Sequence, residues 1–461
     1  MATANTPSAL LSQTMGSRPM TVFQWRAIGL CCLINMLDGF DVMVMAFTAA
    51  SVTAHWALTG TQLGYLLSAG LVGMTAGSFL IAPWADRFGR RPVVLLCVAL
   101  VGFGMICSSQ AQTPIQLAAL RFVTGLGIGG ILASSYVIAG EYASDRWRSL
   151  AISVQATAYA LGATLGGLAT AKVIGAVGWQ SVFLYGGIVT LATLPVLFAW
   201  LPESLDFYLS RRPAGALDRI NHILRRVGIP TLATLPSEGQ GEQTNMRRSI
   251  AYLLSPAMRR ATILIWVSFF LIMFGFYFVM SWSPRLLVAT GLTNEQGITG
   301  GVLLNLGGIV GTALLGLLAA RLPLYKVHFA YLIATALLMS LLLSLAGEVG
   351  QTLTLAFFLG VFVNGCVAGM FSTTPMVYEP SHRVTGLGWG IGMGRLGSIL
   401  APLAAGPLVD AKWRPDQIYT LYAAAFALAA VTVVLLHYAV QRRNSGPAAE
   451  PPLHQAGRRA I

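Results

Sequence analysis

The stretch INMLDGFDVM (residues 34–43) places two carboxylates, Asp38 and Asp41, in the middle of the first long apolar segment of the chain. An acidic side chain at the centre of a membrane-spanning helix costs about 2.5 to 3.5 kcal/mol on insertion scales, so it is retained where it faces a polar cavity or a partner. The two aspartates are therefore the first candidates for a functional role.

The composition indicates a protein that lies mostly in lipid. Of 461 residues, 56% are hydrophobic and 10% are charged, and the mean hydropathy is +0.70. These values exclude a soluble protein of this size. A spanning helix needs about 20 mostly apolar residues, and twelve such stretches begin near Arg26, Gln62, Pro92, Ile115, Ser149, Ser181, Arg260, Gly297, His328, Thr352, Thr385 and Ile418. The sequence therefore predicts an all-α membrane protein with twelve transmembrane helices in two six-helix halves.

Polar segments divide the chain into five parts. We expect a cytoplasmic N-terminal tail (1–25), a first six-helix half (26–201), a cytoplasmic linker (202–258), a second six-helix half (259–441) and a cytoplasmic C-terminal tail (442–461). Within the linker, residues 218–227 are predicted to form a short basic amphipathic helix on the membrane surface, and the tract 238–244 is predicted to be flexible. The alternative is that the linker is only a solvated tether.

The basic residues predict the orientation in the membrane. The polar N-terminus shows no cleavable signal peptide, so we expect it to stay in the cytoplasm. Of the 29 Lys and Arg residues, 23 then fall at cytoplasmic termini, loops or helix ends, which by the positive-inside rule places both termini in the cytoplasm. The net charge of +13 is then attributed to attraction by the anionic cytoplasmic leaflet, and no nucleic-acid partner is predicted.

Residue types that serve catalysis or metal binding form no recognisable pattern in the sequence. The five cysteines lie in apolar segments without the spacing of a metal site or a disulfide framework, and we expect them to be packing residues. The sequence has no Ser/His/Asp constellation and no phosphate-binding loop, so an enzyme is the least favoured class and no cofactor or metal is expected. His328 and His382 are predicted to be ordinary interfacial residues at cytoplasmic helix ends.

The two halves share a weak internal repeat. Adding 234 to the numbers of Gly73, Gly77 and Arg87 gives Gly307, Gly311 and Arg321, and adding 235 to those of Arg148 and Gly162 gives Arg383 and Gly397. Parallel six-helix repeats, with a site between them near the membrane midplane, suit alternating access in which one half rocks against the other.

The paired aspartates can carry a proton on physical grounds. Asp38 and Asp41 are three residues apart, so they share one helical face. Two carboxylates this close in a low dielectric cannot both ionise comfortably, and one is expected to take up and release a proton near the working pH. The alternative is that both are fixed anions that pair with Arg121 and a backbone dipole.

Other polar residues at membrane depth are candidates for substrate binding. Arg395 is a permanent cation whose planar fork suits a carboxylate. Arg121 needs a carboxylate partner, for which Asp38 or Asp41 is available, and its alternative role is a purely structural ion pair. The remaining candidates are aromatic or amide side chains that can flank or bond a ring or, alternatively, join two helices: Tyr277, Trp282, Asn364 and Gln155.

The segment APWADRFGRRP (residues 82–92) forms a tight basic turn between the second and third predicted spans. It resembles the loop motif of the major facilitator superfamily, although Ala82 replaces the opening glycine. The resemblance implies that Asp86 and Arg90 lock the two halves together in the outward-facing state. The alternative is that the arginines of this loop only follow the positive-inside rule. We assign conformational gating to Asp86, Arg87, Arg90, Arg91 and Glu141.

Two further segments resemble the same superfamily. The run RFVTGLGIGG (121–130) is similar to its Arg-x-x-x-Gly-x-Gly-x-Gly helix, whose glycines allow close backbone approach. The run GATLGG (162–167) stands where antiporters of the superfamily commonly carry Gly-Pro-x-x-Gly-Gly. The absence of the proline favours a symporter or uniporter over a drug/proton antiporter.

Four runs resemble the aromatic acid:proton symporter family: DGFD (38–41), SWSP (281–284), NLGG (305–308) and RVTGLGWGIGMGRLGSILAP (383–402). The resemblance implies a monomeric transporter of the bacterial inner membrane that couples inward proton flow to uptake of small aromatic carboxylates such as hydroxybenzoates or benzoate. Alternatives are a symporter of another organic anion or a neutral solute, an efflux antiporter, and a transport-inactive sensor with a transporter fold.

Overall fold

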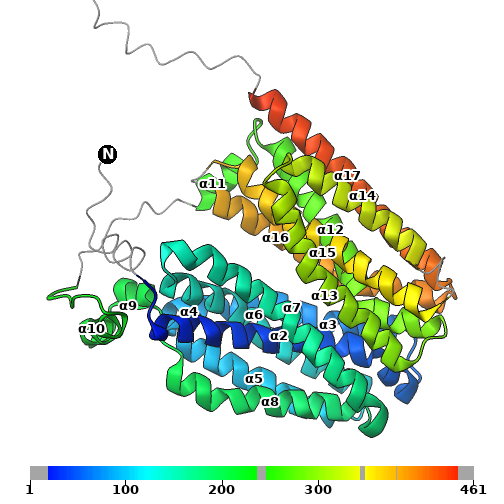
Figure 1. Cartoon of the computed structure of the whole chain (residues 1–461), viewed down its shortest axis with the longest axis horizontal. Helices are drawn as coiled ribbons and strands as arrows, with labels where there is room; N and C mark the ends of the chain where they lie inside the picture. Colours follow the sequence, from blue (N-terminus) through cyan, green and yellow to red (C-terminus); the bar gives the residue numbers. More distant parts are fainter. Residues whose placement is uncertain (1–18, 236–245, 343–347, 380–381, 445–461) are drawn as a thin grey trace, which may run out of the picture.

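The computed structural model describes residues 19–235, 246–342, 348–379 and 382–444 (Figure 1). Within these ranges all regular secondary structure is α-helical. The expected tails lie largely outside the described residues, as does the tract 238–244 that the sequence predicts to be flexible.

The first group of long helices comprises α2 (Val22–Trp56), α3 (Gly60–Leu80), α5 (Arg90–Ser109), α6 (Pro114–Tyr142), α7 (Asp145–Val177) and α8 (Trp179–Trp200), with the short α4 (Ala82–Phe88) between α3 and α5. The second group comprises α12 (Arg259–Ala289), α13 (Asn294–Ala319), α14 (Leu324–Leu342), α15 (Val349–Val377), α16 (Arg383–Asp410) and α17 (Pro415–Asn444). Each of the twelve predicted spans falls on one of these helices, which confirms the all-α membrane fold of twelve helices in two six-helix halves.

Eleven of the twelve helices are long and apolar enough to cross a membrane by length and composition. The twelfth, α16, is 28 residues long and carries glycines and Arg395 along its middle. Helices are the natural solution in lipid because each one satisfies its own backbone hydrogen bonds. A charged, glycine-rich helix of this kind is stable in a bilayer where neighbouring helices surround it.

Three of the helices begin at a threonine capping box. The side chains of Thr21, Thr59 and Thr293 accept hydrogen bonds from the third helical residue, which in each case is a glutamine that bonds back to the cap backbone. This reciprocal cap satisfies two of the backbone N–H groups that every helix start leaves free. The capped threonines therefore fix where α2, α3 and α13 begin.

The linker between the two groups contains three short helices, α9 (Leu205–Arg211), α10 (Ala216–Val227) and α11 (Met246–Leu253). In Figure 1, α9 and α10 lie beside the first group and α11 lies beside the second. Helix α10 buries Ile220, Ile223, Leu224 and Val227 on one face, which confirms the amphipathic helix predicted in this part of the linker. We call the end of the bundle with these helices the linker end, and the opposite one the far end.

The internal repeat is visible in how the helices cross. A Cβ atom built on Gly73 would lie 2.1 Å from the carbonyl oxygen of Phe122, and one built on Gly307, its repeat partner, 2.1 Å from that of Phe357. The first crossing joins α3 to α6 and the second joins α13 to α15. Only glycine allows two backbones to approach this closely, so the repeated glycines mark equivalent helix crossings in the two halves.

A second pair of repeated glycines behaves in the same way. A Cβ atom on Gly162 of α7 would lie 1.9 Å from the carbonyl oxygen of Met36 on α2, and one on Gly397 of α16 would lie 2.4 Å from that of Phe270 on α12. The repeated arginines also match, because Arg148 donates to the carbonyl of Gly140 and Arg383 donates to that of Tyr378. The weak sequence repeat thus corresponds to repeated packing.

The two groups are joined by hydrogen bonds between α3 and α16. Near the far end, the Asp410 carboxylate accepts the backbone N–H groups of Gly60 and Thr61 at 2.5 and 2.9 Å and the Thr61 hydroxyl at 2.5 Å. A carboxylate at the start of a helix is stabilised by the free N–H groups and the helix dipole there. Further in, the Ser68 hydroxyl donates to the carbonyl of Ile399 at 3.0 Å. Asp410 thus holds the far ends of α3 and α16 together.

The close crossing at Gly162 predicts opposite effects for two glycine substitutions on α7. Gly162→Ala should lower the unfolding temperature of the purified protein by several degrees, because a methyl group there overlaps the Met36 carbonyl and overpacking costs about 1 to 3 kcal/mol. Gly175→Ala, where nothing lies within 4 Å of a built Cβ, should leave the temperature unchanged or raise it. Thermal unfolding in detergent measures both, and equal stability of the two variants would contradict the packing argument.

Candidate functional site

Helix α2 carries both aspartates on the side that faces the protein interior. The side chains of Asp38 and Asp41 are 2% and 3% exposed, and they lie one helical turn apart in the middle of α2. Burial of two carboxylates in one short stretch requires compensation from the surrounding helices. The structure provides very different surroundings for the two.

Asp41 is part of a buried ion pair. A terminal guanidinium nitrogen of Arg121 on α6 lies 2.9 Å from Asp41 Oδ1, and the other donates to the Asp41 backbone carbonyl at 3.3 Å. The same guanidinium donates to the Thr124 hydroxyl at 2.5 Å and lies 5.2 Å from the ring centroid of Phe183. Of the two carboxylates expected as partners of Arg121, Asp41 is therefore the one that pairs with it. A cavity of about 30 Å³ between α2, α3 and α6 borders the pair.

Asp38 has no such cation. Its Oδ2 atom is buried and has no hydrogen-bond partner among the described residues. It interacts electrostatically with Tyr136 of α6 and with Tyr159 of α7. Helix α7 passes directly against α2 here, since a Cβ on Gly39 would lie 2.0 Å from the Tyr159 carbonyl oxygen. Asp38 also interacts electrostatically with Asp41 and with Cys97, so it is a buried carboxylate with two phenols, a thiol and a second carboxylate in its electrostatic surroundings.

Tyr159 connects Asp38 to the second six-helix half. It interacts electrostatically with Tyr277 of α12 and with Arg395 of α16 as well as with Asp38. We call Asp38, Tyr159, Tyr277 and Arg395 the central polar group. Its members come from two helices of each half, so the group lies between the halves, as expected for the site of a protein built from parallel repeats.

Arg395 is the cation of the central polar group. Within the described part of the chain its guanidinium forms no ion pair, and its side chain is half-buried in the middle of α16. Gly394 and Gly397 bring this stretch of α16 close to Met273 and Phe270 of α12. An unpaired cation at this depth is costly in a bilayer unless an anion or water reaches it, and a guanidinium fork is well shaped for a carboxylate.

Two further predicted residues have buried polar atoms without a partner. Gln155 lies one turn before Tyr159 on α7, and both its amide oxygen and its amide nitrogen are buried without a hydrogen bond to any described residue. The indole nitrogen of the fully buried Trp282 on α12 is also unpartnered within the described residues. Such groups are rare in folded proteins because each costs desolvation free energy. Gln155 is four residues before Tyr159, a member of the central polar group. Trp282 packs in the hydrophobic core.

Asn364 lies at a crossing of two helices. Its amide donates to the carbonyl of Gly360 within α15 at 3.0 Å, and a Cβ on Gly308 of α13 would lie 2.5 Å from its side chain. These contacts belong to the α13–α15 crossing. They agree with the alternative interpretation of Asn364 as a residue that joins two helices.

Two residues have positions that the sequence did not indicate. Tyr136 neighbours Asp38, and its position 15 residues after Arg121, about four turns along the same side of α6, is a signal that periodicity could have supplied. His328 was predicted to be interfacial, and this is wrong: it is fully buried, with Nε2 3.0 Å from the Cys366 carbonyl of α15. Gly369 leaves room for the imidazole, so α14 and α15 enclose it.

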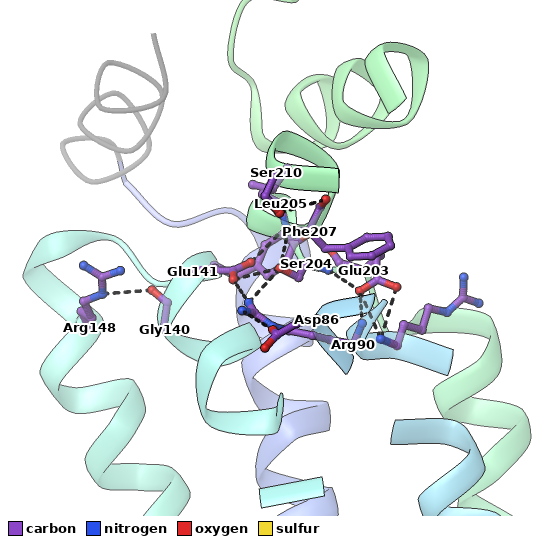
Figure 2. Close-up of polar contacts among 12 residues, drawn as sticks. Asp86, Arg90, Gly140, Glu141, Arg148, Glu203, Ser204, Leu205, Phe207 and Ser210 are labelled. Atoms are coloured by element: carbon purple, nitrogen blue, oxygen red, sulfur yellow. Dashed lines mark hydrogen bonds and ion pairs between the residues drawn. The ribbon is translucent and has the colours of Figure 1, made fainter. Parts of the chain in front are cut away.

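Three of the predicted gating residues, Asp86, Arg90 and Glu141, form a network at the linker end, shown in Figure 2. The Arg90 guanidinium pairs with Glu141 of α6, lies 3.7 Å from the exposed carboxylate of Asp86, and donates to the Ser204 hydroxyl at 2.9 Å. Glu141 in turn accepts the Ser204 hydroxyl at 2.9 Å and the Leu205 backbone N–H at 3.0 Å. The network therefore ties α4, α5 and α6 to the start of α9.

Glu203, just before α9, anchors the same region from the other side. Its carboxylate accepts the backbone N–H groups of Arg90, Arg91 and Ser204 at 2.8 to 3.1 Å. Burial raises the pKa of the Glu203 carboxyl, and these backbone hydrogen bonds act in the opposite direction. The exposed Arg87 guanidinium lies 5.3 Å from the Phe88 ring centroid. All of these contacts lie within the first half and the linker.

A twelve-helix bundle of two parallel repeats, with buried charges between the halves, is the architecture of a secondary transporter. The family model described as Major Facilitator Superfamily matches residues 31–348, and the chain belongs to this superfamily. Its members are transporters, not enzymes, as the sequence predicts.

The chain is also similar to individual members over most of its length. It is 33% identical to the 4-hydroxybenzoate transporter PcaK of Pseudomonas aeruginosa, over 91% of this chain and 94% of that protein. It is 32% identical to the gallate transporter of Pseudomonas putida, over 90% of this chain and 93% of that protein. The solved structure of the xylose transporter XylE from E. coli, in a partially occluded inward open conformation, matches with a TM-score of 0.70 at 17% identity, over 89% of this chain and 97% of that one. The sequence relatives confirm the resemblance to the aromatic acid:proton symporter family.

The different surroundings of the two aspartates predict different effects on stability. Asp41→Asn removes the charge that compensates Arg121, and loss of one partner of a buried ion pair costs about 3 to 5 kcal/mol. Asp38→Asn removes a charge that no described cation compensates, so it should leave stability unchanged or raise it. Unfolding of the two purified variants beside the wild type compares them directly, and a less stable Asp38→Asn would mean that Asp38 is the structural carboxylate.

Proposed function

We propose that this protein is a secondary active transporter that couples inward proton flow to the uptake of small aromatic carboxylates. The observation that carries the proposal is the central polar group, in which Tyr159 interacts electrostatically with a half-buried arginine of the second half and with a buried carboxylate of the first half, neither of which has an ion-pair partner among the described residues. The names of its relatives support the substrate class, because two of them are described as transporters of 4-hydroxybenzoate and gallate.

In this proposal Arg395 binds the substrate carboxylate through its planar fork. Tyr159, which interacts electrostatically with Arg395 and with Tyr277, contacts the ring together with Tyr277. Gln155, whose amide atoms are unsatisfied, supplies a donor and an acceptor for ring hydroxyl groups. Trp282, in the core, and Asn364, at the α13–α15 crossing, support the helices that carry the site without contacting the substrate, and Arg121 acts on the site indirectly through Asp41.

Proton coupling is assigned to the pair of aspartates, with a different task for each. Asp41 is held by Arg121 at 2.9 Å and serves as the fixed anion. Asp38 has an unpartnered carboxylate oxygen and serves as the group that binds the proton. Protonation of Asp38 removes a negative charge close to the anionic substrate, so proton and substrate binding favour each other.

The orientation and the access route follow from charge and from contacts between the halves. The linker end carries most of the arginines, so we assign it to the cytoplasm, with both termini there and the protein in the inner membrane of a bacterium. Asp410 joins the halves at the far end, so the substrate leaves the site toward the linker end in this conformation. The gating residues at that end would engage the second half when residues 26–201 rock against residues 259–441 as a monomer.

Uptake into proteoliposomes tests the proposed function. An imposed inward proton gradient should drive accumulation of radiolabelled 4-hydroxybenzoate, and benzoate or gallate should compete while xylose does not. Accumulation without any gradient would contradict proton coupling, and gradient-driven export would reverse the proposed direction. Failure to transport any ring acid, in vesicles that contain folded protein, would move the function to another anion.

The assignment of the proton to Asp38 predicts a separation of two activities. Asp38→Asn should lose gradient-driven accumulation by about tenfold or more but retain exchange of internal for external substrate, because exchange needs no net proton movement. Asp145→Asn, at an exposed helix start, is the matched control and should retain both. If Asp38→Asn still accumulates substrate against a gradient, another residue carries the proton.

The role of Arg395 predicts a change in substrate affinity. Arg395→Lys keeps the charge and loses the fork, and loss of a charge-assisted hydrogen bond costs about 1.5 to 3 kcal/mol, so KM for the carboxylate should rise about tenfold or more. Arg321→Lys, at an exposed helix end, should leave KM unchanged. An unchanged KM in Arg395→Lys would mean that the arginine does not contact the substrate.

A further inference from the structure

A second site-like feature lies at the linker end of the first half, away from the central polar group. A cavity of about 350 Å³ is enclosed by the starts of α2 and α5, the end of α8, and the linker helices α9 and α10. Three arginines line it, Arg91, Arg219 and Arg226, together with His222. We call it the arginine cavity.

The cationic side chains around the arginine cavity are not held in ion pairs. Within the described residues none of Arg26, Arg91, Arg219 and Arg226 forms an ion pair. Two carboxylates line the cavity too. Glu203 accepts backbone N–H groups and interacts electrostatically with Arg91, and Asp218 forms no ion pair with any described residue. The Nε atoms of Arg26 and Arg91 are buried and have no partner among the described residues. Arg91 also donates to the carbonyl of Phe198. The three arginines of the lining therefore outnumber its two carboxylates, and none of the three is held in an ion pair among the described residues.

Aromatic rings hold these arginines in place. The Phe23 ring centroid lies 5.6 Å from the guanidinium carbon of Arg26 and 5.6 Å from that of Arg226. The Tyr208 ring centroid lies 5.9 Å from that of Arg219. Stacking on a ring orients a guanidinium without neutralising it, so the charges are positioned and remain available to an anion.

The aromatic and apolar surface beside the cavity places it at the edge of the bilayer. Phe198 and Trp200, at the end of the spanning helix α8, are 67% and 50% exposed, and Trp200 lines the cavity. Exposed aromatic side chains at the end of a spanning helix are typical of the interface between lipid tails and headgroups. A ligand that enters the cavity from this side comes from the membrane.

We propose that the arginine cavity binds the phosphate of an anionic phospholipid from the leaflet at the linker end. Basic pockets between helices on the cytoplasmic side are suited to anionic headgroups, and guanidinium groups bind phosphate oxygens with two parallel hydrogen bonds. The acyl chains lie along the exposed end of α8, and the headgroup holds α10 on the first half through Arg219 and Arg226. This proposal is independent of the transported substrate.

Native mass spectrometry of the full-length protein in detergent, titrated with phosphatidylglycerol or phosphatidylcholine, tests the proposal. Phosphatidylglycerol should bind more tightly than phosphatidylcholine. The double variant Arg219→Gln and Arg226→Gln should bind phosphatidylglycerol about 30-fold more weakly, since each arginine near an anionic lipid surface contributes about fivefold. Arg225→Gln is the matched control, because Arg225 is exposed on the same helix and does not line the cavity; it should bind like the wild type.

Three results would overturn the proposal. Equal binding of the two lipids would mean that charge plays no part, and unchanged binding by the double variant would place the lipid elsewhere. A thermal stabilisation by inorganic phosphate as large as that by phosphatidylglycerol at the same concentration, lost in the double variant, would assign the cavity to a free anion. Unfolding curves of the lipid-free variants verify that each one is folded.

Discussion

The cost of charge inside a bilayer is the constraint on which this structure depends. The charges of Arg121 and Asp41 compensate each other, with a guanidinium nitrogen 2.9 Å from a carboxylate oxygen. This ion pair fixes α6 against the middle of α2. Asp38, one turn away on the same helix, then has no cation of its own. Arg395 of the other half carries a charge of the opposite sign, and Tyr159 interacts electrostatically with both Asp38 and Arg395. Arg121 and Asp41 thus compensate each other. Asp38 in the first half and Arg395 in the second half each remain without an ion-pair partner among the described residues.

The internal repeat shows how the fold tolerates this asymmetry. Glycines at equivalent positions, such as Gly73 and Gly307, bring equivalent helices into backbone contact, so the two halves share a scaffold that needs no charge. On this scaffold, the first half carries the buried Arg121–Asp41 ion pair, whereas Arg395 in the middle of α16 forms no ion pair with any described residue. The packing of the two halves is therefore similar, whereas their buried charges differ, and the central polar group arises from that difference.

The sequence predicts the fold well and the site only in part. Hydropathy locates the helices because a bilayer imposes a length and a composition on each one. The same pattern cannot distinguish Asp38 from Asp41, since both lie on one face of α2, and their difference depends on which one Arg121 reaches. The prediction for His328 is wrong for a related reason, because the burial of its side chain depends on the space that Gly369 leaves on another helix. The contact of Asp410 with the start of α3 joins residues 350 positions apart, and no local pattern encodes it.

The two ends of the bundle have different kinds of polar contact, and this bears on how the halves exchange conformations. At the far end Asp410 bonds across the halves, whereas at the linker end Arg90, Glu141 and Ser204 bond within the first half. In the proposed mechanism, closing the linker end breaks the Asp410 contacts and forms new ones from the exposed Asp86. A ligand shifts such an equilibrium only by its difference in affinity for the two states. In the proposed mechanism that difference arises at the central polar group, where the substrate and the proton bridge charges that belong to different halves.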